Sequence, residues 1–218
     1  MSLKDTWERA WRYELAVATK NGEVSLSDIR QSSRTTKANP DGENVSWWYE
    51  NGYEFFKSWV TWRENSAWKI WTLPNGEPAI EVSLEVEFGG IPFKGAIDRV
   101  FELENGELII LDLKTGARTP STDFQLEVYA CMLERTYGIR PQWGCYWMAR
   151  TGQTSMAVDL SKFTLKKLDT VVAQFHKARE NNIYLPNFDG CKMCSLQEHC
   201  EYKSGEKASP LGELEYVD

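Results

Sequence analysis

The chain has 218 residues, of which 42% are hydrophobic, and it carries a formal net charge of −7 with a pI of about 5.1. Bulk positive charge is therefore not how it would hold nucleic acid, although bound divalent ions and local lysines can supply a positive field. The sequence has no apolar run of about 18 residues and no apolar core near its start, so we expect neither a transmembrane span nor a signal peptide. We therefore expect a cytoplasmic, intracellular protein without a membrane partner, whose five cysteines are reduced or metal-bound.

Helices are predicted to open the chain. Apolar residues at three- and four-residue spacing predict a helix over residues 5–19, and a short helix is predicted over 26–32. A polar loop follows, and a second long helix is expected over 46–66. Tryptophans crowd this region, and we favour packing over a stacking surface for bases as their role. These residues are Trp47, Trp48, Trp59, Trp62, Trp68 and Trp71.

A run of strands comes next. Residues 79–88 alternate strictly, with Ile80, Val82, Leu84, Val86 and Phe88 on the apolar face. Two further strands, over 93–103 and 107–113, complete a three-stranded meander. The third is apolar on both faces, which is typical of a central strand.

The second half of the chain alternates helices and strands. We expect a helix over 123–137 that Gly138 ends, strands over 142–149 and 155–160, and a helix to residue 181 that Ser161 caps. The order of elements predicts an α/β or α+β domain with a mixed sheet.

Charged residues interrupt the predicted strands at Asp98, Asp112 and Lys114. Asp112 and Lys114 are two residues apart and share a face. The hairpin turn decides whether Asp98 joins them. A two-residue Asn105-Gly106 turn sends the aspartates to opposite faces, whereas a three-residue turn with Gly106 in the left-handed region, or a β-bulge, sets Asp98 opposite Asp112.

Two aspartates on one face repel each other unless a cation lies between them. Carboxylates and water suit Mg²⁺ or Mn²⁺, and Lys114 beside such an ion could orient water or stabilise charge on a phosphate oxygen. The alternative is that Asp98, Arg99, Asp112 and Lys114 form surface ion pairs.

These residues resemble a known family. Gly95-x-x-Asp98, then Asp112-x-Lys114-Thr115-Gly116, then a Gln-x-x-x-Tyr pair resemble, in order and in context, the PD-(D/E)XK nucleases, and most closely the RecB-type and Cas4-like exonucleases. The Gln-x-x-x-Tyr pair is Gln125 and Tyr129. The resemblance implies a restriction-endonuclease-like core, a central mixed β-sheet flanked by helices, with a C-terminal cysteine-rich appendage.

The resemblance also implies roles for the matched residues. Asp98 and Asp112 would bind Mg²⁺ or Mn²⁺, Lys114 would act near the attacking water, and Gln125 and Tyr129 would contact the nucleic-acid backbone or support the lysine. The family usually adds an acid on the first strand, for which Glu81 fits best.

The first-strand acid has an alternative, and one family feature is missing. Glu85 is the competitor of Glu81 on the same polar face. Many relatives carry a histidine on the long helix before the sheet, but His176 and His199 both come too late in this chain. Glu50 or Glu54 would stand in that place.

Three cysteines, Cys191, Cys194 and Cys200, lie close together near the end of the chain and are typical of a metal site. Cas4-like relatives use such cysteines with an earlier fourth one to hold a [4Fe–4S] cluster, but here no cysteine precedes Cys131. A cluster with another fourth ligand, a Zn²⁺ site that recruits His199, and free thiols all remain open. For Cys131 and Cys145 we expect the role of small buried hydrophobic residues.

We therefore expect a nuclease domain over 1–186, with N-terminal helices over 1–70 and a core over 78–182, followed by a cysteine-containing segment over 187–218. The predicted function is a Mg²⁺- or Mn²⁺-dependent deoxyribonuclease, an exonuclease that acts on single- or double-stranded DNA ends in recombination, repair or phage DNA processing. A recombinase, helicase or CRISPR-integration partner is compatible with it. The alternative is a catalytically inactive DNA-binding or scaffolding subunit that retains the fold.

Overall fold

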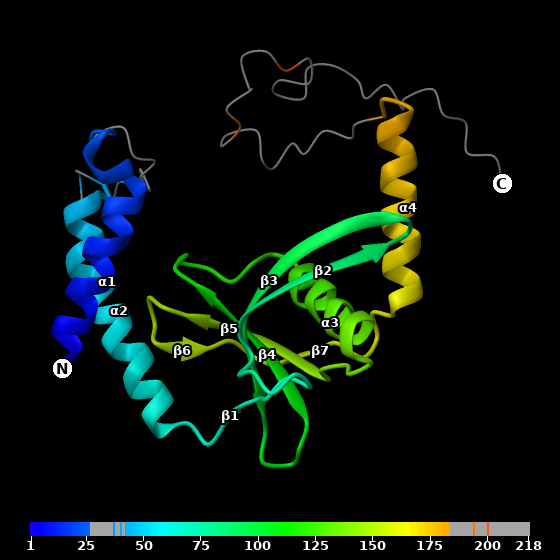
Figure 1. Cartoon of the computed structure of the whole chain (residues 1–218), viewed down its shortest axis with the longest axis horizontal. Coiled ribbons are helices and arrows are strands. Elements are labelled where there is room, and N and C mark those ends of the chain that lie inside the picture. The colour runs from blue at the N-terminus through cyan, green and yellow to red at the C-terminus, as the bar shows by residue number, and fades with distance from the viewer. Residues whose placement is uncertain (27–36, 38–39, 41, 184–193, 195–199, 201–218) are drawn as a thin grey trace. The chain divides into compact units, whose positions relative to one another are not determined.

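The computed structural model describes residues 1–26, 37, 40, 42–183, 194 and 200 (Figure 1). Its elements in chain order are α1 (Leu3–Ala18), a 3-10 turn (Lys20–Gly22), α2 (Val45–Asn65), β1 (Lys69–Ile70), β2 (Ile80–Phe88), β3 (Ile91–Glu102), β4 (Leu108–Lys114), α3 (Phe124–Tyr137), β5 (Trp143–Met148), β6 (Gln153–Thr154), β7 (Val158–Asp159) and α4 (Leu165–Glu180). Both long N-terminal helices, the meander and α3 confirm the sequence prediction. The helix predicted over 26–32 lies outside the described residues, apart from its first position.

The strands form one mixed sheet in the order β1-β3-β4-β5-β6, with β2 paired to β3 and β7 paired to β5. β3 and β4 run antiparallel, while β4 and β5 run parallel, with α3 in the connection between them. The fold is therefore α+β, a mixed sheet with helices, as the restriction-endonuclease-like prediction requires. β4 lies between β3 and β5 and is buried over its first five residues, which confirms it as a central strand.

α1 begins with a capping box, in which the Ser2 hydroxyl accepts from the Asp5 amide and the Asp5 carboxylate accepts from the Ser2 amide. α1 and α2 lie side by side (Figure 1), and the Trp7 ring stacks on Phe56 across them. Gly52 of α2 makes this approach close, because a Cβ there would lie 2.6 Å from the Trp7 ring.

One face of the sheet is an aromatic core beneath α2. The buried residues on this face come from alternate positions of three strands, and tryptophans of α2 and of the following loop pack against them. Trp59 contacts Trp147 edge-on, and Trp62 does the same to Phe101. The packing role that we favoured for Trp59, Trp62 and Trp68 is confirmed.

The other face of the sheet is covered by α3. The absence of a side chain at Gly144 of β5 lets this helix pack closely on the sheet, because a Cβ there would lie 3.1 Å from the Leu126 side chain. Gly138 ends α3 in the left-handed conformation, with φ of 69°, as predicted. Cys131 of α3 and Cys145 of β5 are buried, which confirms their expected role.

Two local predictions are wrong. Ile80 is 42% exposed, because Glu81 adopts a φ of 51° and so interrupts the strict alternation of β2 at its start. Ser161 does not cap α4, which begins only at Leu165. The Ser161 amide and hydroxyl instead donate to the Asp159 carboxylate and form a turn.

The chain divides into two compact units. Residues 1–86 and 92–165 form the first, and residues 87–91 with 166–218 form the second. Within the second, the Gly89 amide donates to the Asp169 carboxylate at 3.0 Å. In the part of the chain that the structure describes, no helix is long and apolar enough to cross a membrane.

Candidate active site

The turn between β3 and β4 has three residues, Glu104, Asn105 and Gly106. The Leu103 amide donates to the Glu107 carbonyl at 2.9 Å, and Gly106 has a φ of 81°. The register follows, with Glu102 opposite Leu108 and Arg99 opposite Leu111. Of the two turns considered, the chain uses the one that brings the aspartates together.

Continuing this register by one residue places Asp98 opposite Asp112, on the same face of the sheet. The ladder stops there because the Leu113 amide donates to Asp98 Oδ2 at 2.7 Å instead of to a backbone carbonyl. Asp98 thus has a structural bond on one oxygen. Its other oxygen, Oδ1, accepts no hydrogen bond from the described residues.

Asp112 is buried, with 2% of its surface exposed. The Lys114 ammonium lies 2.6 Å from Asp112 Oδ2, but within the described residues this buried oxygen accepts no well-formed hydrogen bond. Burial raises the pKa of the Asp112 carboxyl, Lys114 opposes this, and Asp98 raises it further. The negative charge of the buried Asp112 carboxylate is therefore only partly compensated by its surroundings.

α3 supplies the next two polar groups. Gln125 Oε1 accepts from the Lys114 ammonium at 2.8 Å, and Gln125 Nε2 donates to the Tyr129 hydroxyl at 2.8 Å. The two residues are one helical turn apart and share a face of α3. A continuous polar chain thus runs from Asp112 through Lys114 and Gln125 to Tyr129.

Gly95 sets how closely α3 approaches β3. A Cβ at this position would lie 3.0 Å from Met132 Sδ and 3.6 Å from the Tyr129 ring. Burial raises the pKa of Tyr129, the hydrogen bond from Gln125 opposes this, and Asp112 and Asp98 raise it further. Tyr129 therefore lies close enough to both aspartates for their charges to influence it.

Sequence reasoning missed Tyr146 of β5. It lies directly opposite Asp112 in the parallel register, and its ring centre is 5.7 Å from the Lys114 ammonium. Burial, with Asp123, Asp112 and Glu127, raises its pKa to about 12. No local motif marks Tyr146, because its place beside Asp112 depends on which strand pairs with β4.

Glu81 is not brought to this cluster. Its carboxylate lies 2.9 Å from the guanidinium of Arg99, which neighbours Asp98 on β3 and so points to the other face of the sheet. The competitor Glu85 is exposed and pairs with Lys94. The structure thus assembles Asp98, Asp112, Lys114, Gln125 and Tyr129 and leaves out both first-strand acids.

The two helix glutamates also make no acidic cluster with the aspartates. Glu54 pairs with Lys57 on the outer part of α2, and Glu50 is exposed. Of the cysteine motif, Cys191 lies outside the described residues. In the described ranges, no three acidic, histidine or cysteine side chains gather closely enough to hold a metal ion on their own.

The aspartates nevertheless suit a divalent cation that also takes ligands from elsewhere. Mg²⁺ is commonly held by one or two carboxylates together with water and substrate phosphates. Asp112 Oδ2 is buried without a well-formed hydrogen bond, and the charge of Asp98 disfavours the Asp112 carboxylate; a cation would relieve both the burial and the repulsion. The cluster is therefore compatible with a divalent cation.

Comparison with known proteins identifies the family of the chain. Residues 26–201 match the PD-(D/E)XK nuclease superfamily, and the chain belongs to it.

Two curated relatives are phage proteins, both called Gene 69 protein. The one from Mycobacterium phage D29 is 33% identical over 81% of this chain and 76% of its own length. The one from Mycobacterium phage L5 is 28% identical over 86% of this chain and 80% of its own length. The solved structure of SSO0001 matches 71% of this chain and 70% of its own chain, with a TM-score of 0.42 and 13% identity.

Proposed function

We propose that this protein is a Mg²⁺- or Mn²⁺-dependent DNA exonuclease of the RecB-type and Cas4-like branch, which acts in phage DNA processing, recombination or repair. The observation that carries the proposal is the arrangement of Asp98 and Asp112 on one face with Lys114 at 2.6 Å from the buried oxygen. Two relatives encoded by phages support the biological setting.

The proposed reaction is hydrolysis of a phosphodiester, in which water forms a new P–O bond and the ester P–O bond breaks. A bound Mg²⁺ or Mn²⁺ supplies charge neutralisation for the phosphate and lowers the pKa of water. Asp98 and Asp112 would hold it.

Lys114 then places a positive charge beside the reacting phosphate, where developing negative charge is stabilised. Gln125 fixes the ammonium through its Oε1 atom, and Tyr129 fixes the Gln125 amide. The Gln125 and Tyr129 pair also supports the RecB-type assignment, because it joins the lysine in one hydrogen-bonded chain.

The test is cleavage of end-labelled linear single- and double-stranded DNA, and of closed circular DNA, with Mn²⁺. We expect linear DNA alone to be degraded, and Asp112→Ala and Lys114→Ala each to reduce the rate at least about 100-fold. Lys94→Ala is the matched control, because Lys94 forms an exposed ion pair with Glu85. Equal cleavage by wild type and Lys114→Ala would overturn the catalytic assignment.

The alternative function, a scaffolding subunit that binds DNA without cutting it, has a distinct outcome in the same assay. DNA binding in a mobility shift with no cleavage under Mg²⁺ or Mn²⁺ would favour it. The polar chain from Asp112 to Tyr129 argues for catalysis, because a scaffold has no need of a buried and partly uncompensated carboxylate.

We further propose that Cys191, Cys194 and Cys200 bind a structural metal, as a [4Fe–4S] cluster or Zn²⁺. The close spacing of the three cysteines in the sequence supports this site. Iron, zinc and acid-labile sulfide analysis of anaerobically purified protein tests it. Metal-free protein with three titratable thiols would contradict it.

A further inference from the structure

We infer that Arg150 is a positioning residue for Lys114, held in place by the buried carboxylate of Glu43. The inference rests on the proposed function for its catalytic meaning, but its structural part stands alone. Arg150 follows β5 and carries no motif in the sequence. Three sets of contacts define its role.

The first contact is with the residue that follows Lys114. Arg150 Nε donates to the Thr115 carbonyl at 2.7 Å, and the neighbouring Ala149 amide donates to the Lys114 carbonyl at 2.9 Å. β4 has ended at Lys114, so these two bonds carry the pairing one residue beyond the strand. Two successive carbonyls at the base of the lysine side chain are therefore fixed from the end of β5.

The second contact is an ion pair. Arg150 Nη2 lies 2.8 Å from Glu43 Oε2, and the Glu43 side chain is only 7% exposed. Glu43 directly precedes Asn44, whose side chain caps α2 by accepting from the Trp47 amide. The ion pair thus joins the start of α2 to the end of β5, and the Arg150 bond to Thr115 continues this link to the end of β4.

The third contact is aromatic. The Arg150 guanidinium lies 5.2 Å from the Trp47 ring, 5.6 Å from Trp48 and 5.9 Å from Phe55. A planar guanidinium that stacks while it donates along two edges has few orientations left. A lysine could not make both polar contacts and the stacking together.

These contacts bear on chemistry because Lys114 reaches two partners at once. Its ammonium meets Asp112 Oδ2 at 2.6 Å and Gln125 Oε1 at 2.8 Å. Small backbone displacements at such a site cost large factors in rate. Arg150 itself is engaged by Glu43 and Thr115, so we assign it no substrate contact.

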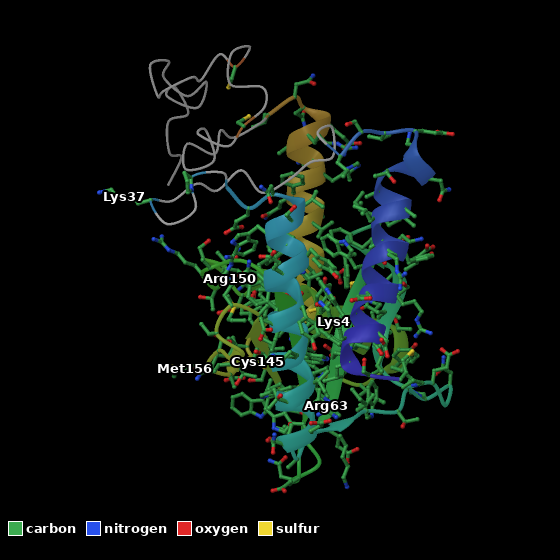
Figure 2. The ribbon with its side chains drawn as sticks, turned by 90° about the vertical axis from the view of Figure 1, so that its left-hand side faces the viewer. Lys4, Lys37, Arg63, Cys145, Arg150 and Met156 are labelled. Carbon is green, nitrogen blue, oxygen red and sulfur yellow. The ribbon has the colours of Figure 1, made fainter. Side chains whose placement is uncertain are left out.

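Arg63 offers a matched control. It too stacks on aromatic rings, Trp62 and Phe101, and donates to a backbone carbonyl, that of Trp68. It lies in the last turn of α2, whereas Arg150 contacts the first turn, and Figure 2 shows the two labels at different heights along this helix. The two arginines resemble each other in packing and differ in whether they contact the end of β4.

The experiment compares Arg150→Gln, Arg150→Lys and Arg63→Gln in the full chain. Backbone hydrogen exchange of the metal-free protein is the first readout. We expect exchange at Ala149 to quicken at least about tenfold in Arg150→Gln and to stay unchanged in Arg63→Gln, because a local contact is lost in the first variant only. Equal exchange at Ala149 in the two variants would overturn the inference whether or not the protein is a nuclease.

Steady-state cleavage kinetics are the second readout. We expect kcat in Arg150→Gln to fall about tenfold or more while KM stays near wild type, and Arg150→Lys to recover part of kcat. A rise in KM with unchanged kcat would overturn the inference and assign Arg150 to substrate contact. If wild type cleaves nothing, the proposed function fails, and the exchange readout alone decides the positioning role.

Discussion

The two faces of the central sheet are built from alternate residues of the same strands, yet they differ in kind. On the α2 face, β4 contributes Ile109 and Leu111 to a core closed by tryptophans. On the α3 face, the same strand contributes Ile110 and then Asp112 and Lys114. One strand thus serves both the core and the proposed active site, because its polar residues come at its end, where α3 supplies hydrogen-bond partners.

The largest loss of folding stability is expected from a substitution on the α2 face. Phe101 is completely buried and contacts Trp62 and Trp68. Phe101→Ala should lower the free energy of unfolding by about 3–5 kcal/mol, measured by urea denaturation. Phe175→Ala, at a residue that is 73% exposed, is the control. Similar losses in both variants would show that this face is not the stabilising one.

A smaller loss of folding stability is expected at the turn that sets the register between β3 and β4. Gly106 has a φ of 81°, where any side chain is strained. Gly106→Ala should cost about 1–2 kcal/mol of unfolding free energy. Gly116→Ala is the control, because a Cβ there meets only an ordinary contact at 3.6 Å. An unchanged stability of Gly106→Ala would argue against the three-residue turn.

A smaller effect is expected where α3 meets β3. In Gly95→Ala the new methyl group would lie 3.0 Å from Met132 Sδ, which is part of a flexible side chain and can move. The variant should lose about 1 kcal/mol of unfolding free energy. The double variant Gly95→Ala with Met132→Ala should show coupling, because the second change removes the clash. Additive losses would contradict this contact.

The smallest change in folding stability is expected to be a gain rather than a loss. The folded state raises the pKa of Asp112, so the folded protein binds the proton more tightly and the wild type gains stability as the pH falls through that raised value. In metal-free protein at neutral pH, Asp112→Asn should therefore be slightly more stable than wild type. This advantage should shrink as the pH falls, which thermal unfolding across a pH series measures.

Mn²⁺ gives the matching measurement. The ion should raise the Tm of the wild type and raise that of Asp112→Asn much less, because the variant keeps only one of the two carboxylates that would hold the ion. A shift of equal size in both proteins would place the ion elsewhere.

Much of the fold could be predicted from the sequence because its signals are local. Helical periodicity predicted α1 and α2, and Gly138 marked the end of α3. The prediction that Ser161 caps α4 failed because the Asp159 carboxylate, two residues earlier, accepts its hydrogen bond and forms a turn instead. Local patterns do not show which of two polar interactions wins.

The site was predictable to the extent that a register argument could be made. The sequence narrowed the hairpin to two alternatives and left both open, and the structure shows the three-residue turn, which pairs Asp98 with Asp112. Glu81 shows the limit. Strand alternation left it as a candidate, but in the structure its carboxylate pairs with Arg99 of β3, and its φ of 51° departs from the regular strand. Tyr146 and Arg150 depend on the pairing of β5 with β4, for which the sequence gives no local signal.

The hydrogen bond from the Leu113 amide to Asp98 has a consequence for ion preference. It uses one lone pair of Asp98 Oδ2 and orients the carboxylate, so we expect Asp98 to bind a cation through Oδ1 alone. A site whose ligands are mostly water and substrate discriminates poorly between metal ions of similar size. Under the proposed nuclease function, turnover should therefore tolerate exchange of magnesium for manganese, and the ion should leave readily once the cleaved strand departs.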